Sequence, residues 1–124
     1  MLLLEDLVVY QVAMEIGDLI HQVVATWDYF NKKSLGDQFV RAADSIALNI
    51  AEGYGRYHFK ENKQFCWYAR GSLFETKCVN QKAINRGLIN GDKFEYINSK
   101  LKRCNALLNA YSQSIGTSNR TNNS

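Results

Sequence analysis

The chain has 124 residues, of which 46% are hydrophobic and 22% are charged, and these values predict one domain with a single hydrophobic core. It contains no run of about 18 apolar residues and its start lacks a basic segment, so we expect no membrane span, no signal peptide and a cytoplasmic location. The net charge of +3 is unevenly placed, because residues 1–55 hold three Lys/Arg and eight Asp/Glu whereas residues 56–124 hold twelve and four. A basic second half favours an acidic partner, which is nucleic acid, an acidic membrane surface or an acidic protein surface such as the first half of a neighbouring subunit.

The first helix is predicted over residues 6–29. Its apolar residues recur in alternating steps of four and three, as in a heptad seam: Val9, Ala13, Ile16, Ile20, Val23, Trp27 and Phe30. Residues 31–34 then form the predicted loop. Ser34 is the expected N-cap of the second helix, with Asp37 as its acidic capping partner.

The second helix is predicted to end near Gly53, with Gly53 and Gly55 in the left-handed conformation of a helix C-terminus. Beside its apolar face the spacing places a row of polar side chains, the polar ridge: Gln38, Arg41, Ser45, Asn49 and Glu52. The ridge has two interpretations. It is either a hydrogen-bonded network that fixes helix packing, or a ligand or nucleic-acid site with Arg41 and Asn49 as donors.

The third helix is predicted over residues 58–86, with Gly87 following its end. Its core positions are Phe59, Cys66, Ala69, Leu73, Thr76 and Ala83. A second row, the basic–aromatic stripe, also follows steps of four and three: Arg56, Lys60, Lys63, Trp67, Arg70, Phe74 and Lys77. A monomeric bundle cannot bury this stripe. We expect its rings, Trp67 and Phe74, to pack against another subunit or to stack on bases, while its five cations meet phosphates.

The fourth helix is predicted to begin after an N-cap at Asn90 or Asp92. Its seam is regular: Phe94, Ile97, Leu101, Cys104, Leu108, Tyr111 and Ile115. Residues 117–124 are polar and aperiodic, which predicts a disordered tail after a domain of residues 1–116. Four amphipathic helices with short connections predict an all-α, antiparallel up-down-up-down four-helix bundle.

The sequence offers little for catalysis or for a cofactor. His21 and His58 lie in different segments, and no Glu-x-x-His motif of a di-iron bundle occurs. Three cysteines, Cys66, Cys78 and Cys104, show no zinc-site spacing and fit reduced, buried thiols. We therefore expect a non-enzymatic protein without metal or cofactor.

Three segments of the sequence resemble one known family. The second helix carries a Gln-x-x-Arg-Ala-x-x-Ser-Ile-x-x-Asn-Ile-Ala-Glu-Gly run over residues 38–53, the third carries Ala69, Gly71-Ser72-Leu73 and Glu75-Thr76, and the first opens with Asp6-Leu7-x-Val9-Tyr10. Together they resemble the small bacterial four-helix-bundle proteins often encoded in intervening sequences of 23S ribosomal RNA genes. The likeness covers residues 4–116, although the family usually has Phe where Leu4 stands.

The resemblance carries expectations about partners. Members of this family form rings, which implies a homo-oligomer, and a pentamer is the stoichiometry that we expect. Some relatives resemble the accessory subunit of diversity-generating retroelements, which partners a reverse transcriptase. We therefore expect either a protein that binds structured RNA or DNA through its basic face, or a structural oligomerisation or protein-interaction module.

Overall fold

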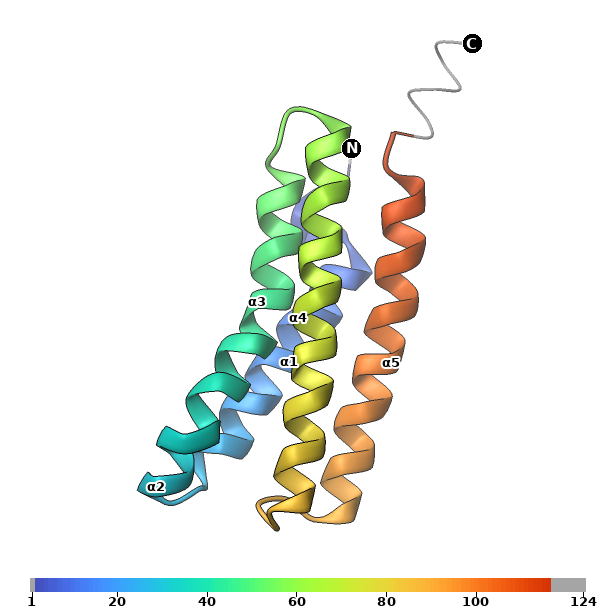
Figure 1. Ribbon diagram of the computed structural model, residues 1–124. Helices are drawn as coiled ribbons and strands as arrows, with labels where there is room; N and C mark the ends of the chain where they lie inside the picture. The colour runs from blue at the N-terminus through green and yellow to red at the C-terminus, as the bar shows by residue number, and fades with distance from the viewer. Residues whose placement is uncertain (1, 117–124) are drawn as a thin grey trace.

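Four long antiparallel helices pack into one bundle in a computed structural model, which describes residues 2–116 (Figure 1). These helices are α1 (Val8–Ala25), α3 (Asp37–Tyr54), α4 (Phe59–Asn85) and α5 (Gly91–Ser114). A 3₁₀ turn, η1 (Leu4–Asp6), precedes α1, and the short α2 (Tyr29–Asn31) and π-helical η2 (Lys32–Gly36) connect α1 to α3. No strand occurs among these residues, so the predicted all-α, up-down-up-down bundle is confirmed. The predicted tail, residues 117–124, lies outside the described part.

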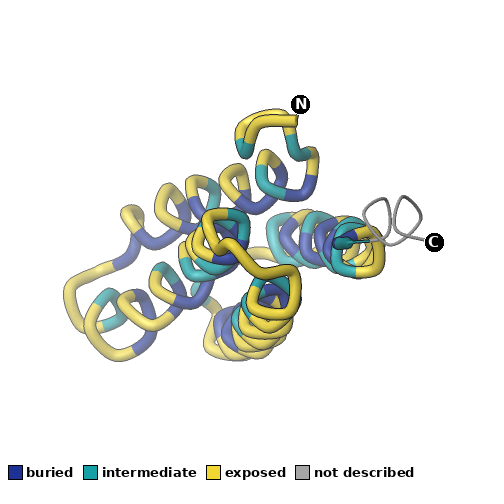
Figure 2. The backbone as a smooth tube through the Cα atoms, turned by 90° about the horizontal axis from the view of Figure 1, so that it is seen from above, coloured by how far each residue is buried: buried dark blue, intermediate teal, exposed yellow. Residues whose placement is uncertain are grey.

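The hydrophobic core lies where the inward faces of the four helices meet, as the buried positions in Figure 2 show. Helix α1 packs against α3 and α5, and α4 packs against the same two helices, so the four form a closed ring. In α5 the predicted seam is buried at Ile97, Leu101, Cys104, Leu108 and Ile115. None of the described helices is long and apolar enough to cross a membrane.

The connection between α1 and α3 differs from the predicted one. Helix α1 ends at Ala25 rather than near Tyr29, because Asp28 caps a new helix by accepting a hydrogen bond from the Asn31 backbone N–H at 2.9 Å. Ser34 is therefore not an N-cap but lies within η2. The break also removes Phe30 from the predicted seam, and its side chain is 73% exposed. Trp27 stays buried, with its ring 6.1 Å from that of Phe39.

The end of α3 shows a different use of glycine from the one predicted. Gly55 has φ −77° and Gly53 lies within α3, so neither glycine is left-handed. A Cβ on Gly53 would lie only 2.7 Å from Phe65 Cβ and 3.1 Å from the Asn62 backbone oxygen. Gly53 is therefore required for the close approach of α3 and α4.

The turn between α4 and α5 follows the prediction. Gly87 has φ +70°, and the Leu88 N–H donates to Ala83 O while the Gly87 N–H donates to Ile84 O, which makes a Schellman ending. Asn90 is the N-cap of α5, since its Oδ1 accepts from the Lys93 N–H at 2.8 Å.

The first turn of α4 was predicted less well. Phe59, assigned to the core from its spacing, is largely exposed because it is the first residue of the helix.

Candidate nucleic-acid interface

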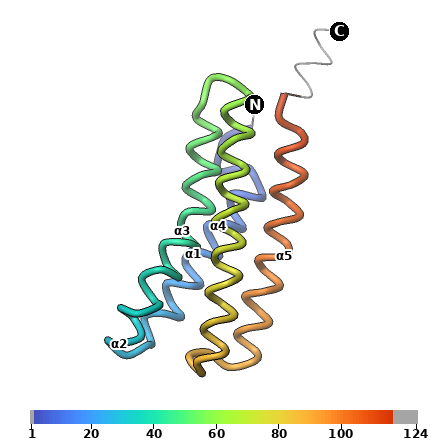
Figure 3. Tube along the Cα trace, viewed as in Figure 1, coloured from blue at the N-terminus to red at the C-terminus, as the bar shows by residue number. Residues whose placement is uncertain are grey.

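The acidic first half and the basic second half of the sequence form two different sides of the molecule. The acidic first half forms α1 and α3, which pack together, and the basic second half forms α4 and α5, which also pack together. The tube in Figure 3 follows α4 and α5 as they run antiparallel beside each other. Positive charge is therefore concentrated on the α4–α5 side.

The basic–aromatic stripe lies along the exposed surface of α4. Trp67 is 67% exposed and Phe74 is 44% exposed, as expected for rings that a single bundle cannot bury. Among the predicted phosphate-binding cations, Lys60, Arg70 and Lys77 are exposed and Lys63 is half-buried. Arg56 is also exposed, but it lies in the turn before α4 rather than on the helix.

The cations of the stripe have different partners. The Arg56 Nη2 is 2.7 Å from Glu52 Oε1, and its guanidinium lies 4.9 Å from the centre of the Phe65 ring. Because its charge is paired, Arg56 is the weakest of the five as an anion site. The guanidinium of Arg70 and the ammonium of Lys77 lie 5.2 and 6.0 Å from the centre of the Phe74 ring, so this ring holds two cations at one place.

The α4 stripe faces a matching polar row on α5. The α5 side chains follow the same steps of four and three: Asn98, Lys102, Asn105, Asn109 and Ser112. Between the two rows lie two consecutive depressions, together called the α4–α5 groove. One, of about 360 Å³, is lined by Leu73, Phe74, Lys77, Asn98, Leu101, Lys102 and Asn105. The other, of about 280 Å³, is lined by Cys66, Trp67, Arg70, Leu108, Asn109, Ser112 and Gln113.

All the charged side chains that line the α4–α5 groove are cations. Arg70, Lys77 and Lys102 line it, and no Asp or Glu is among its lining residues. The contribution of α5, in which Lys102 and the three asparagines share one face of the helix, was not predicted from the sequence. The regular spacing of these polar residues was the available signal, but the prominent apolar seam of the same helix concealed it.

The polar ridge of α3 does not form the network that we considered from the sequence. Ser45 Oγ donates to Arg41 O at 2.7 Å and Asn49 Nδ2 donates to Ser45 O at 2.8 Å, so both side chains bond the backbone of their own helix. Gln38 Nε2 reaches Glu75 Oε2 of α4 at 3.5 Å, and Glu52 pairs with Arg56. Gln38, Arg41 and Glu52 are exposed, while Ser45 and Asn49 are half-buried.

A buried polar contact between helices is found instead at Asn80 of α4. This side chain is 0% exposed, and its Nδ2 donates to Phe94 O at 3.2 Å and to Asn98 Oδ1 at 3.0 Å, both in α5. These two bonds satisfy the buried Nδ2 and fix how α4 and α5 are aligned, whereas the Oδ1 of Asn80 has no hydrogen-bond partner among the described residues. It also orients Asn98, which lines the α4–α5 groove.

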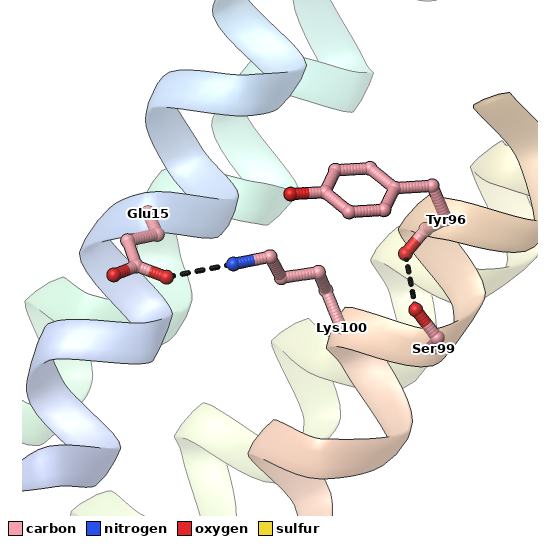
Figure 4. A network of polar contacts seen from close by, with 4 residues as sticks. All are labelled: Glu15, Tyr96, Ser99 and Lys100. Atoms are coloured by element: carbon pink, nitrogen blue, oxygen red, sulfur yellow. Dashed lines mark hydrogen bonds and ion pairs between the residues drawn. The ribbon is translucent and has the colours of Figure 1, made fainter.

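An ion pair connects the acidic and basic sides within one chain. Lys100 Nζ of α5 donates to Glu15 Oε2 of α1 at 2.7 Å, and the ammonium also lies 5.7 Å from the centre of the Tyr96 ring (Figure 4). The hydrogen bond from Lys100 holds the pKa of Glu15 below its usual value, and the same bond raises the pKa of Lys100. The Glu15 carboxylate is therefore already paired with a cation of its own chain.

A second groove, of about 250 Å³, lies between α1 and α3 and is acidic and apolar. Asp18 and Asp44 line it together with Tyr10, Met14 and Leu48. The helices approach closely there, because a Cβ on Gly17 would lie 2.6 Å from Asp44 Oδ1. Its lining contains no Lys or Arg, so its charge is opposite to that of the α4–α5 groove.

The cysteines are placed as expected from the sequence at two of three positions. Cys66 and Cys104 are buried, and burial raises the pKa of each thiol to about 11, whereas Cys78 is exposed. Across residues 2–116, no group of three His, Cys, Asp or Glu side chains is arranged to hold a metal ion.

Comparisons with known proteins agree with this fold. A solved structure from the S23 ribosomal protein family of Bacteroides thetaiotaomicron, whose function is unknown, superposes with a TM-score of 0.75 at 21% identity. The superposition covers 84% of this chain and 97% of that one. No curated protein matches the sequence. The family model of the 23S rRNA-intervening sequence proteins matches residues 5–110, and the chain belongs to this family.

Proposed function

We propose that this protein is non-catalytic and binds nucleic acid through its α4–α5 side. The observation that carries the proposal is the α4–α5 groove, which three cations line without any acidic side chain. Lys60 and Lys63 extend the positive surface along α4 beyond the groove. The name of the family refers to intervening sequences of 23S rRNA, so structured RNA is the first nucleic acid to test.

Affinity is expected to come mainly from phosphate contacts. Three to five neutralised phosphates give a slope of log K against log salt between about −2 and −4.5, at about 0.7 to 0.9 per contact. Affinity should then fall by about two to three orders of magnitude between 50 and 300 mM salt. Fluorescence anisotropy with a labelled RNA hairpin and a duplex DNA across a salt series measures this slope.

Charge reversal tests whether the groove is the binding surface. In the double variant Arg70→Glu, Lys77→Glu, the slope of log K against log salt should decrease in magnitude by about 1.4 to 1.8, because two phosphate contacts are lost. The matched control, Lys82→Glu with Arg86→Glu, makes the same change of charge at exposed positions near the end of α4. Equal losses in both variants would mean that net charge rather than the groove governs binding, and no binding by the wild type at 50 mM salt would contradict the proposal.

A second candidate function is that of an interaction module, either a homo-oligomer, with a pentamer as the expected form, or a partner of a protein such as a reverse transcriptase. Two exposed surfaces favour it: Trp67 and Phe74 on α4, and the acidic, apolar groove between α1 and α3. Their opposite charges allow the basic–aromatic stripe of one copy to pack against the acidic groove of the next. Such head-to-tail contacts generate closed rings when the rotation between copies closes.

A further inference from the structure

We propose that the α4–α5 groove binds unpaired bases of a single-stranded polynucleotide, which stack on Trp67 while their phosphates contact the neighbouring cations. This inference rests on the proposed function and narrows its ligand. Phosphate contacts alone would accept duplex and single strand alike. Exposed rings in a positively charged groove require a base whose face is free.

Trp67 is the free stacking surface of the groove, whereas the Phe74 ring already contacts the cations of Arg70 and Lys77. Trp67 and Phe74 are seven residues apart and therefore share one face of α4, with about 10.5 Å between them along the axis at 1.5 Å per residue. Trp67 has no hydrogen bond, ring contact or cation contact within the described residues, so its face is free for a ligand. Arg70 lies between the two rings in sequence and lines the groove below Trp67.

A glycine keeps the surface between these rings open. Gly71 lies four residues after Trp67 and three before Phe74, on the same face of α4. It is exposed, and a Cβ built on it would meet nothing within 4 Å. Glycine is less favourable than alanine inside a helix, and no contact with the described residues requires its small size at this position. Its absent side chain instead allows a flat group to lie against the helix between the rings.

The α5 wall of the groove supplies hydrogen-bonding groups that suit base edges. Asn98, Asn105 and Asn109 present amides, which both donate and accept hydrogen bonds. The Oδ1 of Asn105 is buried at this wall and has no hydrogen-bond partner. A rotation of this amide toward a bound base would let its Oδ1 accept a hydrogen bond from a base N–H, such as the N3–H of uracil. In a duplex these edges and faces are already paired and stacked, so the single strand is the better ligand.

The charge of the groove favours a polynucleotide over a protein as its occupant. Its polar lining consists of cations, amides and a hydroxyl, without a carboxylate that would attract basic residues of a protein. Lys77 of α4 and Lys102 of α5 line the groove from its two walls, which places positive charge on both sides of a bound strand. A backbone with one negative charge per nucleotide matches this arrangement.

The experiment compares three probes of equal length by fluorescence anisotropy at 100 mM salt: a 12-mer of oligouridylate, an abasic 12-mer with the same phosphates, and a 12-base-pair duplex. Oligouridylate is chosen because its bases stack little on one another. It should bind about 5- to 150-fold more tightly than the abasic oligomer for each stacked base, from stacking worth about 1–3 kcal/mol per base. The variant Trp67→Ala should remove most of this advantage and leave the abasic affinity unchanged.

A second variant separates binding from folding. Gly71→Gln adds a good helix former, so its melting temperature should rise, while its side chain fills the space between the rings. Oligouridylate affinity should fall toward that of the abasic oligomer. A variant that is more stable and yet binds bases less well cannot be explained by loss of structure.

Three outcomes would overturn the inference, and they differ in what they leave standing. Equal binding of oligouridylate and the abasic oligomer, unaffected by Trp67→Ala, rejects base stacking but leaves phosphate binding intact. No binding of any probe, either at 100 mM salt or when the salt is lowered to 50 mM, rejects the proposed function as well. If Trp67→Ala lowers the mass measured by light scattering while oligouridylate binding is unchanged, the rings belong to a protein interface.

Discussion

Asn49 and Asn80 show at the scale of single residues how burial decides the role of a polar side chain. The spacing of the sequence drew attention to Asn49, which is half-buried and bonds a carbonyl of its own helix. Asn80 was not singled out, although it is fully buried and bonds two groups of another helix. Sequence spacing identifies a face of a helix but not the side chain that a neighbouring helix covers.

Alanine substitution should distinguish these two asparagines. Asn80→Ala removes two hydrogen bonds between α4 and α5 and leaves a small cavity, so we expect a loss of about 1–3 kcal/mol in the free energy of unfolding. Asn49→Ala removes one hydrogen bond at a half-exposed position and introduces a better helix former. The free energy of unfolding of this variant should therefore stay within about 0.5 kcal/mol of the wild type. Urea denaturation followed by circular dichroism measures both, and equal losses would contradict the assignment.

At the scale of the elements, the sequence predicted the long helices well and their connections less well. Heptad steps located all four helices because each must bury one apolar face in the same core. The α1–α3 connection was wrong because both Asp28 and Ser34 are good N-cap residues, and local sequence does not decide between them. For the candidate groove, the spacing of the sequence identified the row of residues on α4, whereas the row on α5 becomes part of the groove only because the two helices are neighbours. Whether these residues bind a ligand stays a prediction.

The glycines at the end of α3 provide a test of close helix packing. Gly53→Ala should destabilise the protein by about 1–2 kcal/mol, because overpacking against Phe65 and Asn62 outweighs the gain in helix propensity. Gly55→Ala is the matched control, since the nearest atoms to its Cβ would be 3.6 Å away and its φ is −77°. It should be neutral or stabilising by up to about 1 kcal/mol. Thermal unfolding of both variants checks this, and the reverse order would support the left-handed conformation expected from sequence.

At the scale of the whole molecule, the separation of acidic and basic residues along the chain gives the bundle one acidic side and one basic side. Helices that are consecutive in sequence pack as neighbours, so α1 with α3 and α4 with α5 form two sides of different charge. The link between Glu15 and Lys100 joins these sides within one copy. Each side also exposes apolar side chains, Leu48 on one and Trp67 on the other, which a single copy leaves uncovered.

Self-association follows from these uncovered surfaces and is measured by light scattering coupled to size exclusion. We expect a homo-oligomer, and a pentamer would have a mass of about 71 kDa, five times the chain mass of 14.2 kDa. Trp67→Glu should lower this mass if the stripe packs against another copy, since it places a charge in an apolar contact. Tyr57→Glu is the control, because Tyr57 is an exposed ring outside the stripe. A single species of 14.2 kDa at micromolar concentration would contradict self-association.

The two tryptophans of the chain lie in opposite surroundings, and this makes the unlabelled protein its own optical probe. Trp27 is enclosed in the core beside Phe39, whereas Trp67 stands in solvent at the α4–α5 groove. Unfolding exposes Trp27 to water and shifts its emission to longer wavelength, while a ligand that covers Trp67 changes emission without altering the core. Replacing either indole with phenylalanine leaves one reporter, so the stability of the bundle and the occupancy of the groove can be followed separately by their own emission.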